Sequence, residues 1–296
     1  MGYIFVICAY LLWGVFPLFW KQLSHIPVIE IIFHRMFWSC ITMIFFLTAL
    51  RNWQWVSLLR KSPKTILLGL LSSILITSNW IIFVWSVNNG YLVEASLGYF
   101  INPLLYIVVG VCVFKEKVRR GQIAAVAIAA IGVFYLTFVY GHFPFIAFTL
   151  AGTFTLYGLI RKVVPLGAFA GLFLETAFMI LPAIFYILYI EVQKDGNFYY
   201  SGFSTQILFI STGVVTVAPL LFFAAGIRRI ELYAVGFLQY IAPTLQFLLG
   251  VFLYKEAFSF SQLIGFSFIW LAILVFCIES YIFFKQSKMT KVLEET

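Results

Sequence analysis

The start of the second apolar stretch groups residues that can bind or carry charge. Glu30, His34 and Trp38 follow one another at intervals of four residues, so they share one face of a helix. Arg35, next to His34, can hold an anionic group, and His34 can take up a proton near neutral pH. We predict that His34, Arg35 and Trp38 line a binding cavity. The alternative is that Arg35 reaches the outer lipid head groups and Glu30 pairs with a neighbouring cation.

Polar and aromatic groups also interrupt later apolar stretches. An ionisable or amide group inside a membrane is costly, so it needs a partner or a function. The third stretch carries Asn79, Trp80 and Trp85, and the seventh carries Glu175. Trp80 lies in mid-stretch and favours a cavity wall, whereas a tryptophan near a stretch end, such as Trp85, is usually an interfacial anchor. Glu175 is either a substrate ligand or part of a salt bridge between helices.

Prolines inside apolar stretches indicate distorted helices. Pro103 removes one backbone hydrogen bond and clashes with the carbonyl of Tyr99, and Pro243 does the same to Gln239. In lipid, such distortions are tolerated only where they face protein or water. Both positions favour a central cavity, with a purely packing bend as the alternative. The predicted helix-kink or gating residues are Pro17, Pro103, Pro219 and Pro243.

These patterns define one set of candidate substrate-binding residues. It consists of His34, Arg35, Trp38, Asn79, Trp80, Trp85, Glu94, Tyr99, Asn102, Tyr157, Glu175, Gln239 and Tyr240. The sequence contains no recognisable phosphate-binding loop, metal-ligand cluster or catalytic triad pattern. The four cysteines lie inside apolar runs without ligand spacing. We therefore expect no enzyme activity, no cofactor and no metal site.

The composition requires that these residues be positioned by membrane-spanning helices. The 296-residue chain is 63% hydrophobic and only 10% charged, with a mean hydropathy of +1.04. A soluble domain carries about 25% charged residues, so this chain is predicted to be an all-α integral membrane protein. The net charge of +8 comes from basic residues scattered in short loops. It reflects membrane topology and gives no reason to expect a nucleic-acid partner.

A spanning helix needs about 20 apolar residues, and the chain offers ten such segments. They are Gly2–Trp20, Ile29–Leu50, Ile66–Val87, Ala95–Phe114, Gly121–Tyr140, Phe143–Ile160, Ala168–Ile190, Gln206–Ile227, Ala234–Tyr254 and Gln262–Phe284. The loops between them are short except for Glu191–Thr205, and they leave no room for a soluble domain.

Part of the sequence occurs twice at a constant spacing of 140 residues, from Pro103 to Pro243 for example. We call this spacing the repeat offset. The spacing that separates Pro103 from Pro243 also separates Gly110 from Gly250, Lys115-Glu116 from Lys255-Glu256, and Gln122 from Gln262. Such a repeat in an apolar chain is typical of transporters built from two halves. We expect one five-helix repeat over residues 1–140, a second over 141–284, and a cytoplasmic tail over 285–296.

The distribution of basic residues predicts the orientation. With the amino terminus in the cytoplasm, fifteen lysine and arginine residues fall in inside loops, Arg161 among them, and three in outside loops. This bias predicts that both termini are cytoplasmic. Because each half has an odd number of spans, the halves have opposite orientations, and a substrate site is expected at their interface near mid-membrane.

Several strings resemble the RarD-type permeases of the EamA family, within the drug/metabolite transporter superfamily. They are Trp13-Gly14 with Pro17, Pro27 with Glu30, His34-Arg35, Asn79-Trp80, Glu94 through Pro103, Lys115-Glu116, Gln239-Tyr240 with Pro243-Thr244, and Lys255-Glu256. The resemblance covers nearly the whole chain. It implies ten helices in two inverted five-helix repeats and export of small metabolites, amino acids or drugs across the inner membrane. Ala242 stands where the first repeat has Asn102, so the two proline sites are not chemically equivalent.

The function expected from the sequence is therefore a secondary transporter, a monomer or homodimer, working by alternating access at a central cavity. Two alternatives belong to other classes: an integral-membrane enzyme and a non-transporting receptor or scaffold. The inverted repeat favours the transporter. The lack of a catalytic cluster disfavours the enzyme, and the lack of domains outside the membrane disfavours the receptor.

Overall fold

The computed structural model describes residues 1–89, 91–141, 143–255 and 259–294 of the chain. Every regular element within these ranges is a helix. Eight of the helices are long and apolar enough to cross a membrane, and Leu97–Cys112 forms a shorter apolar segment. The protein is therefore an all-α membrane protein, as its composition predicts.

The first half of the chain supplies five long helices and two short ones. The long helices are α1 (Gly2–Trp20), α2 (Val28–Ala49), α4 (Pro63–Asn88), α5 (Leu92–Cys112) and α6 (Arg120–Tyr140). The 3-10 turn η1 (Lys21–Leu23) and the helix α3 (Val56–Lys61) lie in the connections.

The second half repeats this order. It contains α7 (Phe145–Val163), α8 (Ala168–Val192), α9 (Asn197–Tyr200), α10 (Phe203–Ile227), α11 (Leu232–Gln239), α12 (Ile241–Leu248), the π-helical turn η2 (Leu249–Leu253) and α13 (Phe260–Glu294). The first residues of α8, α10, α11 and α13 follow those of α2, α4, α5 and α6, respectively, by the repeat offset. The spacing found in the sequence motifs is thus also the spacing of the helix boundaries.

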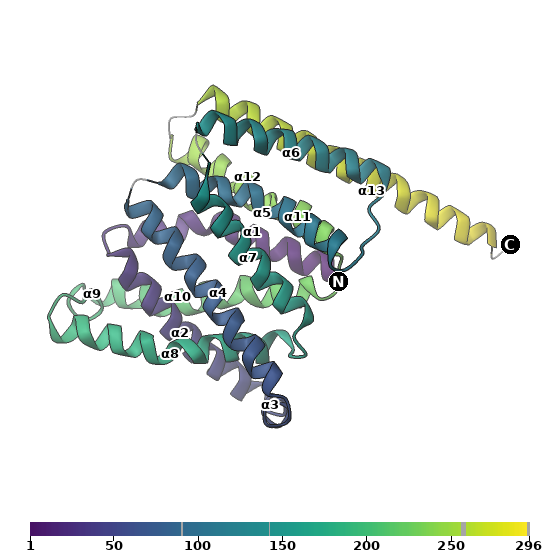
Figure 1. Ribbon diagram of the computed structural model, residues 1–296. Helices are drawn as coiled ribbons and strands as arrows, with labels where there is room; N and C mark the ends of the chain where they lie inside the picture. Colours follow the sequence, from purple (N-terminus) through teal and green to yellow (C-terminus); the bar gives the residue numbers. More distant parts are fainter. Residues whose placement is uncertain (90, 142, 256–258, 295–296) are drawn as a thin grey trace.

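Three of these matching pairs pack side by side with opposite chain directions. In α2 and α8, Phe33 stacks on Tyr186 with ring centroids 4.2 Å apart, and Phe46 meets Phe169 at 6.4 Å. Arg119, at the start of α6, bonds to Glu279 in the second half of α13. The helices α5 and α11 are also in contact. Figure 1 shows α6 and α13 running together along one edge of the molecule.

The first helix of each half packs against helices of the other half. The helix α1 packs on α10, α11 and α12, and its counterpart α7 packs on α4 and α5. At the centre, Tyr10, Tyr106, Tyr157 and Phe223 belong to one buried cluster. These contacts position α2, α4, α8 and α10 around a common centre.

The ninth expected segment is not a single helix. The helix α11 ends at Gln239 and α12 begins at Ile241, so the break lies at the carbonyl that Pro243 displaces. By contrast, α5 continues through Pro103, α1 through Pro17 and α10 through Pro219. The carboxy-terminal helix also differs from expectation, because α13 continues to Glu294 instead of ending at residue 284. In Figure 1, this extension projects beyond the rest of the molecule.

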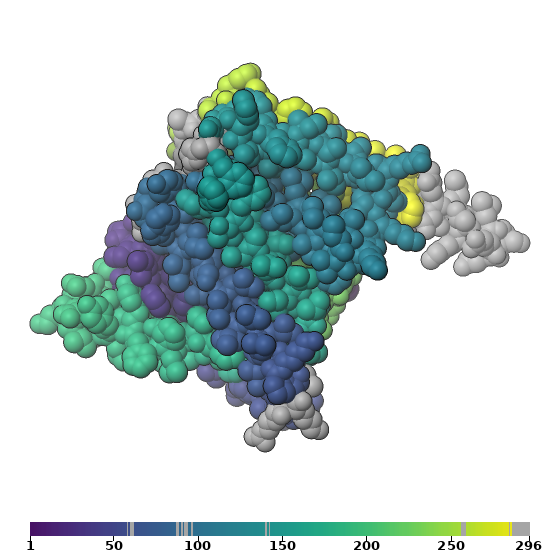
Figure 2. All heavy atoms as spheres, in the orientation of Figure 1, coloured from purple at the N-terminus to yellow at the C-terminus, as the bar shows by residue number. Residues whose placement is uncertain are grey.

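The space-filling view shows how the outer layer is arranged on one face. The helices α4, α6 and α7 cover most of this face, and the corner formed by α8 and α9 projects from it (Figure 2).

Candidate functional site

A narrow cavity lies where α2, α4, α8 and α10 meet. It has about 20 Å³ of space for water-sized molecules, enough for about one water. Its lining includes five pairs of residues separated by the repeat offset: Met36 and Thr176, Ser39 and Met179, Ile76 and Thr216, Thr77 and Val217, and Trp80 and Leu220. Matching positions of the two halves therefore face the same space.

Arg35 lies beside this cavity. Its Nε donates a hydrogen bond to Oγ1 of Thr216 at 3.0 Å. The guanidinium carbon lies 4.4 Å from the ring centroid of Trp80 and 4.8 Å from that of Trp20, both within the range of a cation–π interaction. Trp80 and Thr216 also line the cavity. The arginine is thus held by two aromatic rings and one hydroxyl, contributed by α1, α4 and α10.

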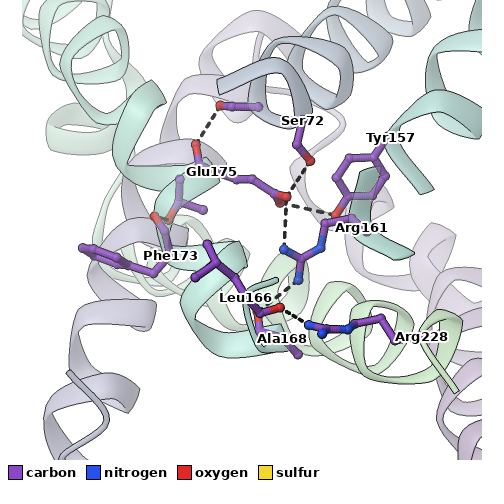
Figure 3. Close-up of polar contacts among 10 residues, drawn as sticks. Ser72, Tyr157, Arg161, Leu166, Ala168, Phe173, Glu175 and Arg228 are labelled. Atoms are coloured by element: carbon purple, nitrogen blue, oxygen red, sulfur yellow. Dashed lines mark hydrogen bonds and ion pairs between the residues drawn. The ribbon is translucent and has the colours of Figure 1, made fainter. Parts of the chain in front are cut away.

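Glu175 lines the same cavity from α8 and has a different environment. Its Oε1 accepts a hydrogen bond from Ser72 at 2.6 Å and lies 3.4 Å from Nη1 of Arg161. Its Oε2 accepts a hydrogen bond from Tyr157 at 3.4 Å. Arg161 is only 1% exposed and Glu175 only 4%, so this is a buried ion pair. Figure 3 shows Ser72, Tyr157 and Arg161 converging on the carboxylate from α4 and α7.

The loop between α7 and α8 is fastened to this cluster. Arg161 donates to the carbonyl of Ala168 at 3.2 Å, and Arg228 donates to the carbonyl of Leu166. Ser73, next to Ser72, donates to the backbone carbonyl of Glu175 at 2.7 Å. The end of the cavity near Glu175 is therefore closed by a connected polar network (Figure 3).

His34 and Trp38 lie outside the cavity lining. The His34 ring lies between Phe209, at 4.1 Å, and Phe198, at 5.2 Å. Its two nitrogens and Nε1 of Trp38 form no hydrogen bond with the described residues. Glu30 accepts hydrogen bonds from the backbone and the side chain of Asn197, at 2.6 and 2.8 Å. Glu30 thus anchors α9, and His34 packs in the aromatic core beside it.

The two asparagines predicted for the site bind the backbone of α7. Asn79 donates to the carbonyl of Leu150 at 2.8 Å and to Thr153. Asn102 donates to the carbonyl of Ala151 at 2.8 Å and to Thr155. In this structure they connect α4 and α5 to α7 and do not reach the cavity.

The remaining candidates are spread over the molecule. Glu94 accepts a hydrogen bond from the backbone N–H of Ile146 at 2.7 Å, at the start of α7. Trp85 stacks on Tyr91 and is 51% exposed. Tyr99 is 41% exposed, lies near Arg35, and its ring meets that of Phe83 at 5.8 Å.

Gln239 and Tyr240 lie at the break between α11 and α12. Both are buried, and the Tyr240 hydroxyl donates to the carbonyl of Phe100 at 3.3 Å. Phe100 and Tyr240 are themselves separated by the repeat offset, so the two halves touch here at matching positions. The structure therefore brings Arg35, Trp80, Glu175 and Tyr157 together around the cavity, with Tyr99 beside Arg35, and leaves the other candidates elsewhere.

Several residues of the site are not among those predicted from the sequence. The distribution of basic residues places Arg161 in a loop. Its spacing of four residues from Tyr157 is the sequence signal that could have placed both side chains on one helix face. The hydroxyl residues Ser72, Ser73 and Thr216 also contribute, and each interrupts an apolar segment. No three His, Cys, Asp or Glu side chains within the described ranges are grouped to hold a metal ion.

Comparison with known proteins identifies the relatives of this chain. Residues 1–138 match the EamA-like transporter family. An uncharacterized transporter, YojE, of Bacillus subtilis is 46% identical over 280 residues, which cover 93% of both chains. The protein RarD of Streptomyces exfoliatus is 41% identical over 93% of this chain and 87% of its own. A solved structure described only as the crystal structure of a protein shares the fold, with a TM-score of 0.67 and 19% identity over 93% of this chain and 96% of its own.

Proposed function

Because the chain belongs to the RarD-type branch of the EamA-like transporter family, we propose that it moves a small metabolite, amino acid or drug-like molecule across the cell membrane by alternating access. The translocation site is the cavity between α2, α4, α8 and α10. Family membership itself makes the protein a multi-pass membrane transporter with a small-molecule substrate. The proposal concerns the site and the mechanism.

The architecture that we propose is two inverted repeats of five spanning helices, over residues 1–140 and 141–284. The constant offset between matching helix starts supports it, as does the opposite direction of α2 and α8. In this scheme α5 and α7 complete the ten spans. The last turn of α7 carries Arg161 and Lys162, which lowers its apolar character.

The observation that carries the proposal is the composition of the cavity wall. Ten of its residues form five pairs at the repeat offset. In transporters with inverted repeats, the substrate binds near mid-membrane at the interface of the repeats. The cavity lies at such an interface and is lined by both apolar and hydroxyl side chains.

The two ends of the cavity differ in a way that suits alternating access. With both termini in the cytoplasm, Glu175 and Arg161 lie in the inner half and Arg35 in the outer half. The Glu175 network closes the inner end. Because the space now holds about one water, a metabolite can enter only after helices move apart. We propose that opening toward the cytoplasm separates Arg161 from Glu175.

Counterflow in proteoliposomes tests transport directly. The purified protein would be offered labelled amino acids, nucleosides and amphenicols, and we expect exchange of at least one class above that of empty liposomes. In a cysteine-free background that retains exchange, Thr77→Cys should become sensitive to a thiol reagent, with protection by the transported solute. The control is Phe138→Cys on α6, where the side chain is 86% exposed. If Thr77→Cys remains insensitive while exchange proceeds, the cavity is not on the path.

A further inference from the structure

Arg35 differs from the other arginines that lie between helices. Arg161 is paired with Glu175, and Arg119 with Glu279. Across the part of the chain that the structure describes, no carboxylate forms an ion pair with Arg35. Within the described ranges, the guanidinium group contacts Thr216, Trp20 and Trp80. All three are uncharged, so no anion among the described residues compensates the positive charge.

An uncompensated charge inside a membrane protein destabilises the fold. Its presence is therefore a reason to look for a function. Placing an arginine inside a membrane-spanning helix is costly on insertion scales. The two aromatic rings offset part of this through cation–π attraction. They leave the terminal nitrogens Nη1 and Nη2 without a protein hydrogen-bond acceptor among the described residues. These nitrogens are therefore available to a ligand that enters the cavity.

The chemistry of Arg35 selects the kind of ligand. A guanidinium presents parallel N–H donors that match a carboxylate in a bidentate geometry. The surrounding groups add a second requirement. The rings of Trp20 and Trp80 flank Arg35, and the adjoining cavity wall contains Met36 and Leu220. These surfaces suit an apolar or aromatic body.

We infer that Arg35 is the anion subsite of the transported substrate, which carries a carboxylate on an apolar or aromatic body. This inference rests on the proposed function, because it assigns the substrate class of the same cavity. The carboxylate takes the place of the missing counter-ion and bonds to Nη1 and Nη2. Trp20 and Trp80 hold the guanidinium plane in position for it.

Matched pairs of ligands test the inference in purified protein. Indole-3-acetate and 3-phenylpropanoate would be compared with their carboxamides. Phenyl phosphate would show whether the site prefers a phosphate to a carboxylate. Binding is measured by equilibrium dialysis and by thermal shift. We expect both carboxylates to bind and their carboxamides to bind at least about tenfold more weakly, because only a charged acceptor pairs with the guanidinium.

Variants of Arg35 show whether the arginine is the binding group. Arg35→Gln should weaken carboxylate binding about tenfold or more, and Arg35→Lys should lie between it and the wild type because lysine lacks the planar fork. The control is Arg229→Gln, since Arg229 also lies over an aromatic ring, Phe5 at 5.4 Å, but on the exposed surface. Each variant is first checked by size-exclusion chromatography, and Arg35→Lys replaces Arg35→Gln if the latter does not fold.

Several outcomes would overturn the inference. They are equal binding of acid and amide, unchanged carboxylate affinity in the Arg35 variants, binding of phenyl phosphate alone, or no binding of either acid. Counterflow separates this failure from failure of the proposed function. If a neutral or cationic solute is exchanged and Arg35→Gln does not slow it, the protein is a transporter without this anion subsite. If the folded protein exchanges no solute at all, the proposed function fails and the inference fails with it.

Discussion

Arg35 and Glu175 occupy matching positions of the two halves, separated by the repeat offset, but their surroundings are not equivalent. Glu175 lies in a closed network with Ser72, Tyr157 and Arg161. Arg35 lies between two tryptophan rings and has no carboxylate partner among the described residues. The helix starts of the two halves match, but the charged side chains at matching positions differ. The Glu175 network can therefore close one end of the cavity, while Arg35 at the other end remains free to bind a ligand.

The buried pair of Arg161 and Glu175 should stabilise the fold only as a pair. Removing one partner leaves the other charge buried, so Glu175→Gln or Arg161→Met should lower the free energy of unfolding by about 3 kcal/mol or more. The double variant should recover most of this loss. The measurement is thermal unfolding in detergent, analysed as a double-mutant cycle.

The control for this cycle is Arg119→Gln. Arg119 is paired with Glu279 at a partly exposed position, with side-chain exposures of 31% and 19%. Its loss should cost about 1 kcal/mol or less because water screens the charges. If the double variant at Arg161 and Glu175 is less stable than both single variants, the pair does not act as a unit.

At the residue scale, the sequence identifies which polar groups matter better than it identifies their partners. Glu175 stands out as an intramembrane acid, but the charge distribution alone places its partner Arg161 in a loop. Asn79 and Asn102 are predicted to line the cavity, whereas their amides bind carbonyls of α7 that lie 71 and 49 residues away. An amide needs partners, but a single sequence does not show whether the partner is a substrate or a neighbouring helix.

At the scale of helices, the repeated Lys-Glu motif connects the two halves. The Glu116 carboxylate accepts hydrogen bonds from the backbone N–H groups of Leu232, at 2.8 Å, and Tyr233, at 3.1 Å, in the first turn of α11. Lys162 lies 3.9 Å from Glu116 and donates to the carbonyl of Ile230 at 2.6 Å. An acidic group at a helix start satisfies free N–H groups and interacts favourably with the helix dipole. The matching Glu256 lies outside the described residues.

Close packing of α5 and α11 depends on Gly236. A Cβ atom at this position would lie 2.6 Å from the backbone oxygen of Pro103, which cannot move away as a side chain could. We expect Gly236→Ala to lower the free energy of unfolding by about 1–3 kcal/mol, the usual cost of overpacking. Thermal unfolding in detergent measures it.

A second glycine provides the comparison for this substitution. Gly152 lies within α7 and has no neighbouring atom within 4 Å of an added Cβ. Because alanine favours helix by up to about 1 kcal/mol over glycine, Gly152→Ala should be neutral or slightly stabilising. Equal effects of the two substitutions would mean that the approach of α5 to α11 is not tight.

Helix positions are the part of the fold that the sequence predicts best. The start of α1 and that of α8 agree to the residue, and most other boundaries lie within three residues, because long apolar runs bounded by polar residues leave few alternatives. The break at Tyr240 and the uninterrupted course of α5 are not predictable, since both helices contain a proline with the same local consequence. Neighbouring helices decide whether the displaced carbonyl finds a new arrangement.

At the scale of the whole molecule, the distribution of basic residues predicts that both termini face the cytoplasm. Lys117, in the loop between α5 and α6, should then lie inside, and Lys194, between α8 and α9, should lie outside. Both side chains are exposed. In intact cells, an impermeant thiol reagent should label Lys194→Cys and not Lys117→Cys. Labelling with the opposite pattern would invert the proposed orientation.

Energy coupling is also a property of the whole molecule, and a proton-coupled carrier needs a titrating group that alternates between water and the substrate site. Glu175 is bonded to Ser72, Tyr157 and Arg161, and Glu94 accepts a hydrogen bond from the backbone of Ile146. His34 lies between two phenylalanine rings and away from the cavity lining, while Arg35 carries a fixed charge. Glu175 and Glu94 are therefore held by hydrogen bonds within the protein, and His34 is held by aromatic packing.

We predict from these contacts that movement follows the substrate gradient without a proton. In proteoliposomes with an imposed pH gradient, wild-type protein, His34→Ala and Glu94→Gln should equilibrate a solute that exchanges in counterflow without concentrating it. Glu175→Gln should change the rate of exchange but not its end point, because it loosens the closed network without removing a proton carrier. Accumulation against the solute gradient, driven by pH and abolished by one of these substitutions, would show that the protein is a proton-coupled carrier and would name its titrating group.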